Sequence, residues 1–298
     1  MTEVTILDGG MSRELQRLGA RLRQPEWSAL ALIESPDIVR NAHTAFIDAG
    51  ADVVTTNSYA LVPFHIGEER FRREGAELIA LSGRLAREAA DAAGRRIVVA
   101  GSLPPIFGSY EPELFRQDEV QDYLSVLVDN LDPYVDVWLG ETLSLIAEGR
   151  AVSTAVAATG KPFWISFTLS DGPGAETEEP TLRSGESVRD AAVWAVEAGA
   201  AALLFNCSRP EVMGRAVATA ANIIADASSA MKLGVYANAF EAASDGAANE
   251  TLTELRTDLT DDRYNRFACE WAEAGATMIG GCCGVGAHHI HSLRQAMR

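Results

Sequence analysis

Short apolar segments alternate with longer amphipathic segments along most of the chain. The apolar segments are rich in Val, Ile, Leu and aromatic side chains and lack a clear polar face, which is typical of strands buried on both sides of a parallel sheet. We predict eight such strands, at residues 5–8, 52–57, 96–102, 135–142, 162–169, 201–207, 232–238 and 276–283.

The amphipathic segments between these strands predict helices. In SPDIVRNAHTAFIDAGA, Ser35 is a candidate N-cap, Pro36 takes the first helical position and Gly50 follows the end. Alternating strands and helices indicate a parallel sheet with helical crossovers, and eight units fit a (β/α)8 barrel. An open doubly wound sheet is disfavoured because DGGMSREL, rather than a G-x-G-x-x-G turn, follows the first strand. The sequence therefore predicts an α/β protein with a (β/α)8 TIM barrel, as a single domain over residues 1–298.

Two polar connections are longer than the others. They span 170–187 and 239–254, and both follow predicted strands on the face where barrel loops build active sites. Each is interpreted either as a lid over the site or as a solvated insertion.

Polar residues stand at the ends of the predicted strands. Burying a polar group without a partner costs free energy, so a barrel strand should end in apolar residues unless its mouth needs polarity. Any one of these residues could simply cap the following helix, but the whole set indicates a functional site. The set is Asp8, Thr56, Asn57, Ser102, Glu141, Thr142, Ser166, Thr168, Asn206, Cys207, Asn238, Cys282 and Cys283.

Three of the four cysteines belong to this set. Cys207 ends the sixth predicted strand, and Cys282 and Cys283 end the eighth, 75 residues later, so a barrel brings three thiols to one rim. Three thiolates with Zn–S bonds of about 2.3 Å hold Zn²⁺ and leave one coordination position open, as catalytic zinc sites do. The glycines that flank the adjacent pair give the backbone the freedom to turn both side chains toward one ion.

Two other interpretations of the adjacent cysteines stay open at this point. A disulfide between Cys282 and Cys283 would form a strained, reducible ring, but it would not require Cys207 on the same rim. Inert buried cysteines would not explain the flanking glycines. The fourth cysteine, Cys269, lies within a predicted helix and is expected to be a small buried hydrophobe.

A run of histidines near the C-terminus also suggests metal binding. His288, His289 and His291 fall on the first turn of the last predicted helix. Three side chains there could not all face the three thiols, so we interpret the run as a helix start.

The charge balance narrows the class of partner. Lys and Arg total 25 against 42 Asp and Glu, which gives a formal net charge of −17. This charge repels nucleic acid and anionic membranes, so neither is predicted as a partner. The N-terminal MTEVTILDGG lacks a leader pattern, and no segment approaches the roughly 18 apolar residues of a membrane helix. We therefore predict a cytoplasmic protein with thiols available for metal binding or catalysis.

Several motifs together resemble the homocysteine S-methyltransferase family. They are ILDGGMSREL, EWSALALIESPDIVRNAH, TTNSY, GETLSLIAEG, FWISFTL, FNCSRPEVM and GATMIGGCCGVGAHHI, and they extend from Ile6 to His291. This family includes S-methylmethionine-dependent enzymes, betaine-homocysteine methyltransferase and the homocysteine module of cobalamin-dependent methionine synthase. The Asn-Cys after the sixth strand and the Gly-Gly-Cys-Cys-Gly of the eighth are the most specific matches.

The resemblance implies a (β/α)8 barrel in which Cys207, Cys282 and Cys283 bind zinc and activate the thiol of homocysteine. It also implies that Asp8 and Glu141 hold the amino group of this substrate. Backbone N–H groups near Gly9 and Gly10 are expected to receive its carboxylate. Further substrate contacts are predicted for Asn57, Ser102 and Asn206. The implied partners are small molecules, homocysteine and an onium methyl donor, of which S-methylmethionine or S-adenosylmethionine is favoured.

The match departs from the family pattern in three places on the barrel mouth. Residues 101–115, which include most of the loop 103–116, read GSLPPIFGSYEPELF where relatives often read GSVGPYGA. Residues 236–241 read YANAFE where relatives often read YPNSGE. Arg13 replaces a threonine that many relatives carry. These departures leave the identity of the methyl donor open, and also that of the acceptor thiol.

Overall fold

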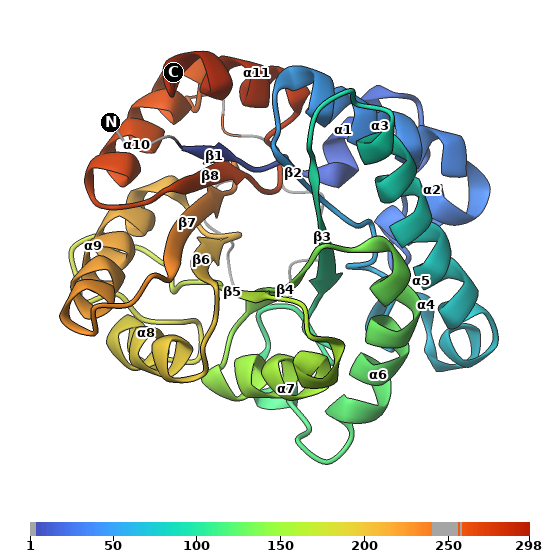
Figure 1. Cartoon of the computed structure of the whole chain (residues 1–298), viewed down its shortest axis with the longest axis horizontal. Helices are drawn as coiled ribbons and strands as arrows, with labels where there is room; N and C mark the ends of the chain where they lie inside the picture. Colours follow the sequence, from blue (N-terminus) through green and yellow to red (C-terminus); the bar gives the residue numbers. More distant parts are fainter. Residues whose placement is uncertain (1–3, 240–255, 257) are drawn as a thin grey trace.

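A computed structural model describes residues 4–239, 256 and 258–298. Eight parallel strands form a ring, and the helices surround it (Figure 1). The hydrogen-bonded order is β1-β8-β7-β6-β5-β4-β3-β2. The predicted (β/α)8 barrel is confirmed. No helix within the described ranges is both long and apolar enough to cross a membrane.

The strands coincide with the predicted segments and mostly begin or end inside them, although β3 (Val98–Leu103) and β4 (Val137–Leu143) each extend one residue past the predicted end. Polar residues at several predicted ends lie just beyond the sheet because they serve the loops and the mouth of the barrel. The strands are β1 (Thr5–Ile6), β2 (Val53–Thr55), β3 (Val98–Leu103), β4 (Val137–Leu143), β5 (Phe163–Phe167), β6 (Ala202–Asn206), β7 (Lys232–Ala237) and β8 (Met278–Gly281).

The helices follow the amphipathic segments. In α3 the ends agree with the prediction, since Pro36 is its first residue and Gly50 follows it at a left-handed φ of 111°. Ser35 takes the N-cap position, but its side chain makes no capping hydrogen bond. The helices are α1 (Met11–Arg17), α2 (Ser28–Glu34), α3 (Pro36–Ala49), α4 (Pro63–Ile66), α5 (Glu68–Asp91), α6 (Val120–Leu131), α7 (Ile146–Val156), α8 (Val188–Glu197), α9 (Pro210–Asp226), α10 (Asp261–Glu273) and α11 (Ala287–Ala296).

Two apolar cores hold the barrel together. A small core inside the ring contains Leu139, Leu204 and Met278. A larger core lies between the sheet and the helices, where Phe46, Phe167 and many smaller side chains pack. Because the ring interior is filled, small molecules have access only at the ends of the strands.

The seam between β1 and β2 is closed partly by side chains. Asp52 donates its backbone N–H to the carbonyl of Ile6 at 2.7 Å, and its carboxylate accepts the N–H of Ile6 at 2.9 Å. At the other end, the carboxylate of Asp8 accepts the N–H of Thr55 at 2.7 Å. Two aspartates therefore supply bonds that a strand ladder would otherwise supply.

Two of the three connections highlighted in the sequence contribute to the barrel mouth. The loop 103–116 carries a short 3₁₀ turn at Pro112–Leu114, and the loop 170–187 is held by isolated bridges from Leu182 to Leu169 and from Thr181 to Ser187. The third connection, 239–254, lies outside the described residues except for Ala239. Its predicted role stays a prediction.

Candidate active site

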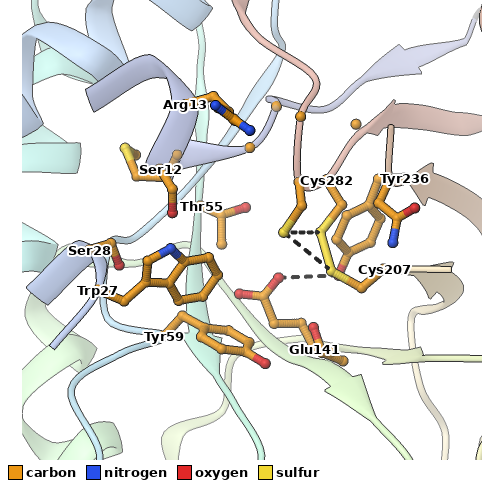
Figure 2. Close-up of a pocket in the computed structure, with 18 of the residues that line it drawn as sticks. Ser12, Arg13, Trp27, Ser28, Thr55, Tyr59, Glu141, Cys207, Tyr236 and Cys282 are labelled. Atoms are coloured by element: carbon orange, nitrogen blue, oxygen red, sulfur yellow. Dashed lines mark hydrogen bonds between the residues drawn. A yellow bond between two sulfur atoms is a disulfide. The ribbon is translucent and has the colours of Figure 1, made fainter. Parts of the chain in front are cut away.

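A cavity of about 170 Å³ opens at the carboxyl ends of the strands. Figure 2 shows its lining, with the cysteines on one side and Trp27 and Tyr59 on the other. Glu141 lies between these two groups. The cavity also contains Asp8, but Ser102 and Asn206 do not contribute to its wall. Most of the polar residues at the predicted strand ends therefore line one cavity, and Ser102, Ser166, Thr168 and Asn206 lie behind its wall.

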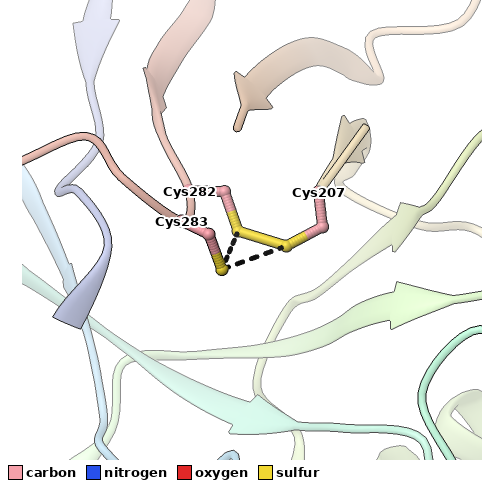
Figure 3. Close-up of side chains that lie close together, drawn as sticks. All are labelled: Cys207, Cys282 and Cys283. Atoms are coloured by element: carbon pink, nitrogen blue, oxygen red, sulfur yellow. Dashed lines mark hydrogen bonds between the residues drawn. A yellow bond between two sulfur atoms is a disulfide. The ribbon is translucent and has the colours of Figure 1, made fainter. Parts of the chain in front are cut away.

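The three thiols come together as the sequence predicts. The Sγ atoms of Cys207, Cys282 and Cys283 all lie within 4.8 Å of one another. Cys207 and Cys282 are joined as a disulfide, and Cys283 Sγ lies 4.0 Å from each of the two bonded sulfurs (Figure 3). The disulfide does not link the adjacent cysteines, so the vicinal interpretation is wrong for this structure.

The glycines near the pair allow this convergence. Cys282 and Cys283 follow β8 in a turn, and Gly284 takes a left-handed φ of 87° there. A Cβ atom on Gly281 would lie 2.1 Å from Cγ1 of Val285, and one on Gly10 would lie 2.4 Å from the carbonyl oxygen of Cys282. A side chain at either position would therefore collide with the turn that carries the two adjacent thiols.

Two buried carboxyl groups face the cavity near the thiols. Burial raises the pKa of Asp8 to about 7, and the nearby Glu141 adds to that shift. Burial also raises the pKa of Glu141 to about 7. None of the ion pairs between described residues includes either group. The pair is therefore suited to a cationic ligand, whose charge would stabilise both ionised forms.

Glu141 is held in place by two hydroxyl groups. Ser102 donates from Oγ to Oε1 at 2.5 Å, and Tyr236 donates from its hydroxyl to Oε2 at 3.4 Å. Ser102 thus acts on Glu141 and does not line the cavity. Glu141 belongs to β4 and not to the first turn of a helix, so the capping explanation does not apply to it.

Asn57 lines the cavity, while Asn206 and Gly10 are engaged elsewhere. The amide of Asn57 donates to the carbonyl of Ser28 at 3.2 Å. Asn206 is fully buried, and its oxygen accepts from Thr142 N at 3.0 Å. The backbone N–H of Gly10 donates to the carbonyl of Val285 at 2.8 Å, so it is not available to a substrate carboxylate.

Backbone strain is concentrated around the cavity. In the described part of the chain, five non-glycine residues have a left-handed φ, and four of them line the cavity. Such conformations cost about 1–3 kcal/mol each and persist where the surroundings impose them, often at functional sites. The four are Trp27 at 47°, Tyr110 at 68°, Thr142 at 60° and Cys207 at 49°.

Comparison with known proteins agrees with this geometry. A family model described as homocysteine S-methyltransferase matches residues 5–297. The chain belongs to the homocysteine S-methyltransferase family.

Relatives in this family match over nearly the whole chain. Homocysteine S-methyltransferase 1 from Brassica oleracea var. italica is 29% identical over 306 residues, which cover 93% of this chain and 88% of that protein. Selenocysteine methyltransferase from Astragalus bisulcatus is 25% identical over 318 residues, with the same coverage of 93% and 88%. The crystal structure of homocysteine methyltransferase MmuM from Escherichia coli in its metallated form has a TM-score of 0.78 and 26% identity, covering 98% of this chain and 96% of that one. An oxidized form of the same enzyme gives a TM-score of 0.79.

Some cavity residues of this family member were missed by sequence reasoning because they come from loops. The hydroxyl of Tyr110, on the loop 103–116, donates to the carbonyl of Cys207 at 3.2 Å. The guanidinium of Arg183, on the loop 170–187, lies 4.1 Å from the centre of the Tyr110 ring and 3.0 Å from Asp171. The two loops therefore contact each other beside Cys207. Only a polar loop after a strand signals such residues in sequence.

The fourth cysteine lies outside the site. Cys269 belongs to α10 but is exposed, so its prediction as a buried hydrophobe is wrong. The buried face of α10 carries Tyr264, Ala268 and Trp271. Cys269 follows Ala268, and one helical step of about 100° turns it away from that face.

The histidine run begins α11, as predicted. His289 Nδ1 accepts the N–H of Gly286 at 3.0 Å, and its Nε2 lies 3.4 Å from Oδ1 of Asp261. Since Nδ1 accepts a hydrogen bond, the proton of the neutral ring is on Nε2, toward Asp261. This arrangement caps the helix through Nδ1, and Asp261, His288 and His289 lie close together outside the cavity. His288 and His291 do not line the cavity.

Proposed function

We propose that this protein transfers a methyl group from an onium donor, S-methylmethionine or S-adenosylmethionine, to the thiol of homocysteine and so forms methionine. We further propose that Cys207, Cys282 and Cys283 hold Zn²⁺ for this reaction. The observation that carries the proposal is the placement of three thiols beside two buried carboxyl groups in one cavity. Membership of the homocysteine S-methyltransferase family supports the acceptor.

The donor set fits zinc. Tetrahedral zinc with Zn–S bonds of about 2.3 Å requires sulfur separations of about 3.8 Å, and Cys283 Sγ lies 4.0 Å from each of the other two sulfurs. The disulfide between Cys207 and Cys282 must be reduced before both can bind. Burial raises the pKa of the Cys283 thiol to about 11, so a cation is needed to hold it as a thiolate at neutral pH. Zinc, when bound, supplies this stabilisation and lowers the pKa of a thiol that joins it.

Asp8 and Glu141 orient the acceptor. Their carboxylates bind the ammonium group of homocysteine, which fixes the amino-acid end of the substrate and leaves its thiol directed toward the cysteines. Thr55 holds Asp8 through its N–H and its hydroxyl, at 2.7 and 3.2 Å. Ser102 and Tyr236 hold Glu141 in the same way. This preorganisation lowers the entropy cost of bringing sulfur and methyl group into line.

The aromatic wall opposite the cysteines suits the donor. Trp27 and Tyr59 meet edge to face with ring centres 5.8 Å apart, and both line the cavity. A sulfonium cation is attracted to such rings. In the transfer, the bond between the donor sulfur and its methyl carbon breaks with its electron pair staying on that sulfur. The acceptor sulfur forms the new bond with its own electron pair.

The test is methionine formation by the reduced, zinc-loaded protein. Homocysteine, cysteine and selenocysteine are offered as acceptors with S-methylmethionine, S-adenosylmethionine or betaine as donors, and the products are measured by mass. We expect methionine from homocysteine with a sulfonium donor. Replacing Cys207, Cys282 or Cys283 by Ala should abolish it together with zinc binding.

Cys269→Ser is the matched control, because it removes the exposed cysteine of α10 and should keep both zinc and activity. Undiminished turnover by the metal-free protein would contradict the proposed role of zinc. Absence of product with every donor would contradict the proposed reaction.

A further inference from the structure

The cavity contains two guanidinium groups as well as its acids. Arg183 is already matched: it forms an ion pair with Asp171 at 3.0 Å, donates to Thr168 Oγ1 at 3.1 Å and stacks on Tyr110. Its side chain is 17% exposed and that of Asp171 is 6% exposed. This arginine therefore neutralises a neighbouring acid and joins two loops.

Arg13, the second guanidinium, lies on the Asp8 side of the cavity. It belongs to the first turn of α1, which begins three residues after Asp8. Figure 2 shows its side chain extending from α1 toward the part of the cavity that contains Cys282. Arg13 lines the same cavity as Asp8, Glu141 and the three site cysteines. Arg13 therefore brings a positive charge to the cavity that holds the thiols and the acidic pair.

The neighbouring residues of α1 have other roles. Glu14 is buried, and its carboxylate accepts from Arg17 and from the N–H of Ala287 at the start of α11. Arg17 is largely exposed. The first turn therefore directs Glu14 into the protein and Arg13 into the cavity.

An amino acid held by its ammonium group also brings a carboxylate into the cavity, because both groups are bonded to the same carbon. Several backbone donors on the Asp8 side are engaged. Gly10 N–H donates to Val285, Gly281 N–H donates to the carbonyl of Asp8, and Thr55 N–H donates to the Asp8 side chain. A carboxylate left near two acids without a cation would be strongly disfavoured.

We propose that Arg13 binds the α-carboxylate of the acceptor amino acid and makes the site selective for amino-acid thiols over simple aminothiols. This inference rests on the proposed function, because it assumes that Asp8 and Glu141 hold the ammonium group. It assigns one end of the substrate to each charge: ammonium to the buried acids, carboxylate to Arg13 and sulfur to the cysteines.

Ligand pairs that differ only in the carboxylate provide the test. Methionine and 3-(methylthio)propylamine carry the product's thioether, so their binding can be measured by calorimetry without turnover. Homocysteine and 3-amino-1-propanethiol are the corresponding acceptors for kinetics. A charged hydrogen bond contributes about 10- to 100-fold in affinity. We expect the wild-type protein to prefer the carboxylate-bearing member of each pair by this factor.

Arg13→Gln should remove most of that preference by weakening methionine binding, while the affinity for 3-(methylthio)propylamine stays the same or improves. Arg13→Lys should restore part of it. Arg21→Gln, which removes an exposed arginine outside the cavity, is the matched control and should keep the full preference. In kinetics, KM for homocysteine should rise in Arg13→Gln with little change in kcat.

Two results would overturn the inference. One is a preference for the carboxylate-bearing ligand that persists in Arg13→Gln, including the case in which only Arg183→Gln removes it. The other is a fall in kcat with no change in either binding ratio, which would mean that Arg13 only offsets the charge of the thiolates. If methionine binds with the expected preference but no donor gives product, the proposed reaction fails while the assignment of Arg13 stands.

Discussion

The seam between β1 and β2 has an aspartate at each end, and the two aspartates have opposite surroundings. At the amino end of the strands, Asp52 is partly exposed, and its carboxylate forms ion pairs with Arg95 and Arg294. At the carboxyl end, Asp8 is buried beside Glu141, and no ion pair between described residues includes it. Both carboxylates accept a backbone N–H across the seam.

The different surroundings of Asp52 and Asp8 indicate that one end of the β1–β2 seam serves stability and the other serves function. A carboxylate that only closes the barrel is best placed where cations and water compensate its charge. Asp8 closes the barrel as well, but burial raises its pKa to about 7, so keeping it ionised costs free energy. Such a cost is expected where a ligand supplies the missing cation.

The largest effect should come from removing the charge at the carboxyl end. Asp8→Asn keeps an oxygen that can accept the N–H of Thr55 but loses the partner of the substrate ammonium. We expect kcat/KM for homocysteine to fall about 100-fold, corresponding to about 3 kcal/mol. The melting temperature should not fall, because a buried charge is removed. Steady-state kinetics measure kcat/KM, and thermal melts measure the melting temperature. A kcat/KM equal to that of the wild type would show that Asp8 has no role in binding the substrate.

Removing the charge at the amino end should lower stability and leave turnover nearly unchanged. Asp52→Asn breaks the ion pairs with Arg95 and Arg294, and we expect a loss of about 2 kcal/mol in the free energy of unfolding. The folded variant should keep kcat/KM within about twofold. Asp37→Asn is the control, since Asp37 is 80% exposed and pairs only at the surface with Arg40, so its loss should cost under about 1 kcal/mol. Denaturant titration measures both variants, and equal losses would show that Asp52 does not secure the seam.

The acidic pair should also make ligand binding depend on pH. Ionised carboxylates bind an ammonium group, and Asp8 and Glu141 ionise as the pH rises through about 7. Methionine carries no titrating thiol, and its affinity should rise roughly tenfold from pH 6 to pH 7.5. Calorimetry at several pH values checks this, and Asp8→Asn should flatten the curve.

The same shifts act on stability with the opposite sign. Because the folded pKa values of these two acids lie above the unfolded values, their contribution to stability is full at low pH and is lost as the pH rises through about 7. If the contribution of Asp8 to the stability of the ligand-free protein instead grew with pH over this range, the pKa of Asp8 would not be raised by folding. The difference between wild-type and Asp8→Asn melting temperatures, followed from pH 5 to 8, isolates this contribution.

The smallest effect should come from the hydroxyl behind the pair. The hydrogen bond from Ser102 lowers the pKa of the Glu141 carboxyl, and Ser102→Ala removes this bond. We expect kcat/KM to fall about 3- to 10-fold, and the midpoint of its pH dependence to move upward. A pH profile of the variant beside the wild type measures the shift. A midpoint that moved downward would mean that Ser102 does not stabilise the ionised carboxylate.

Sequence could predict the residues whose place follows from chain order alone. Asp8, Glu141 and the three site cysteines stand at strand ends, and a parallel barrel brings strand ends to one rim whatever the loops do. It could not predict that Gly10 N–H is engaged by Val285, or that Tyr110 and Arg183 meet, because these contacts depend on how loops pack in space. Burial of Cys269 was misjudged for a related reason: the apolar face of α10 is set by its neighbours and not by residue type.

The four left-handed residues around the cavity have a consequence for protein engineering. A criterion based on backbone conformation alone would favour glycine or asparagine at Trp27, Tyr110, Thr142 and Cys207, since such residues adopt a positive φ with less strain. Each of these positions lines the cavity. In this protein, substitutions chosen at those positions to relieve backbone strain should therefore reduce turnover.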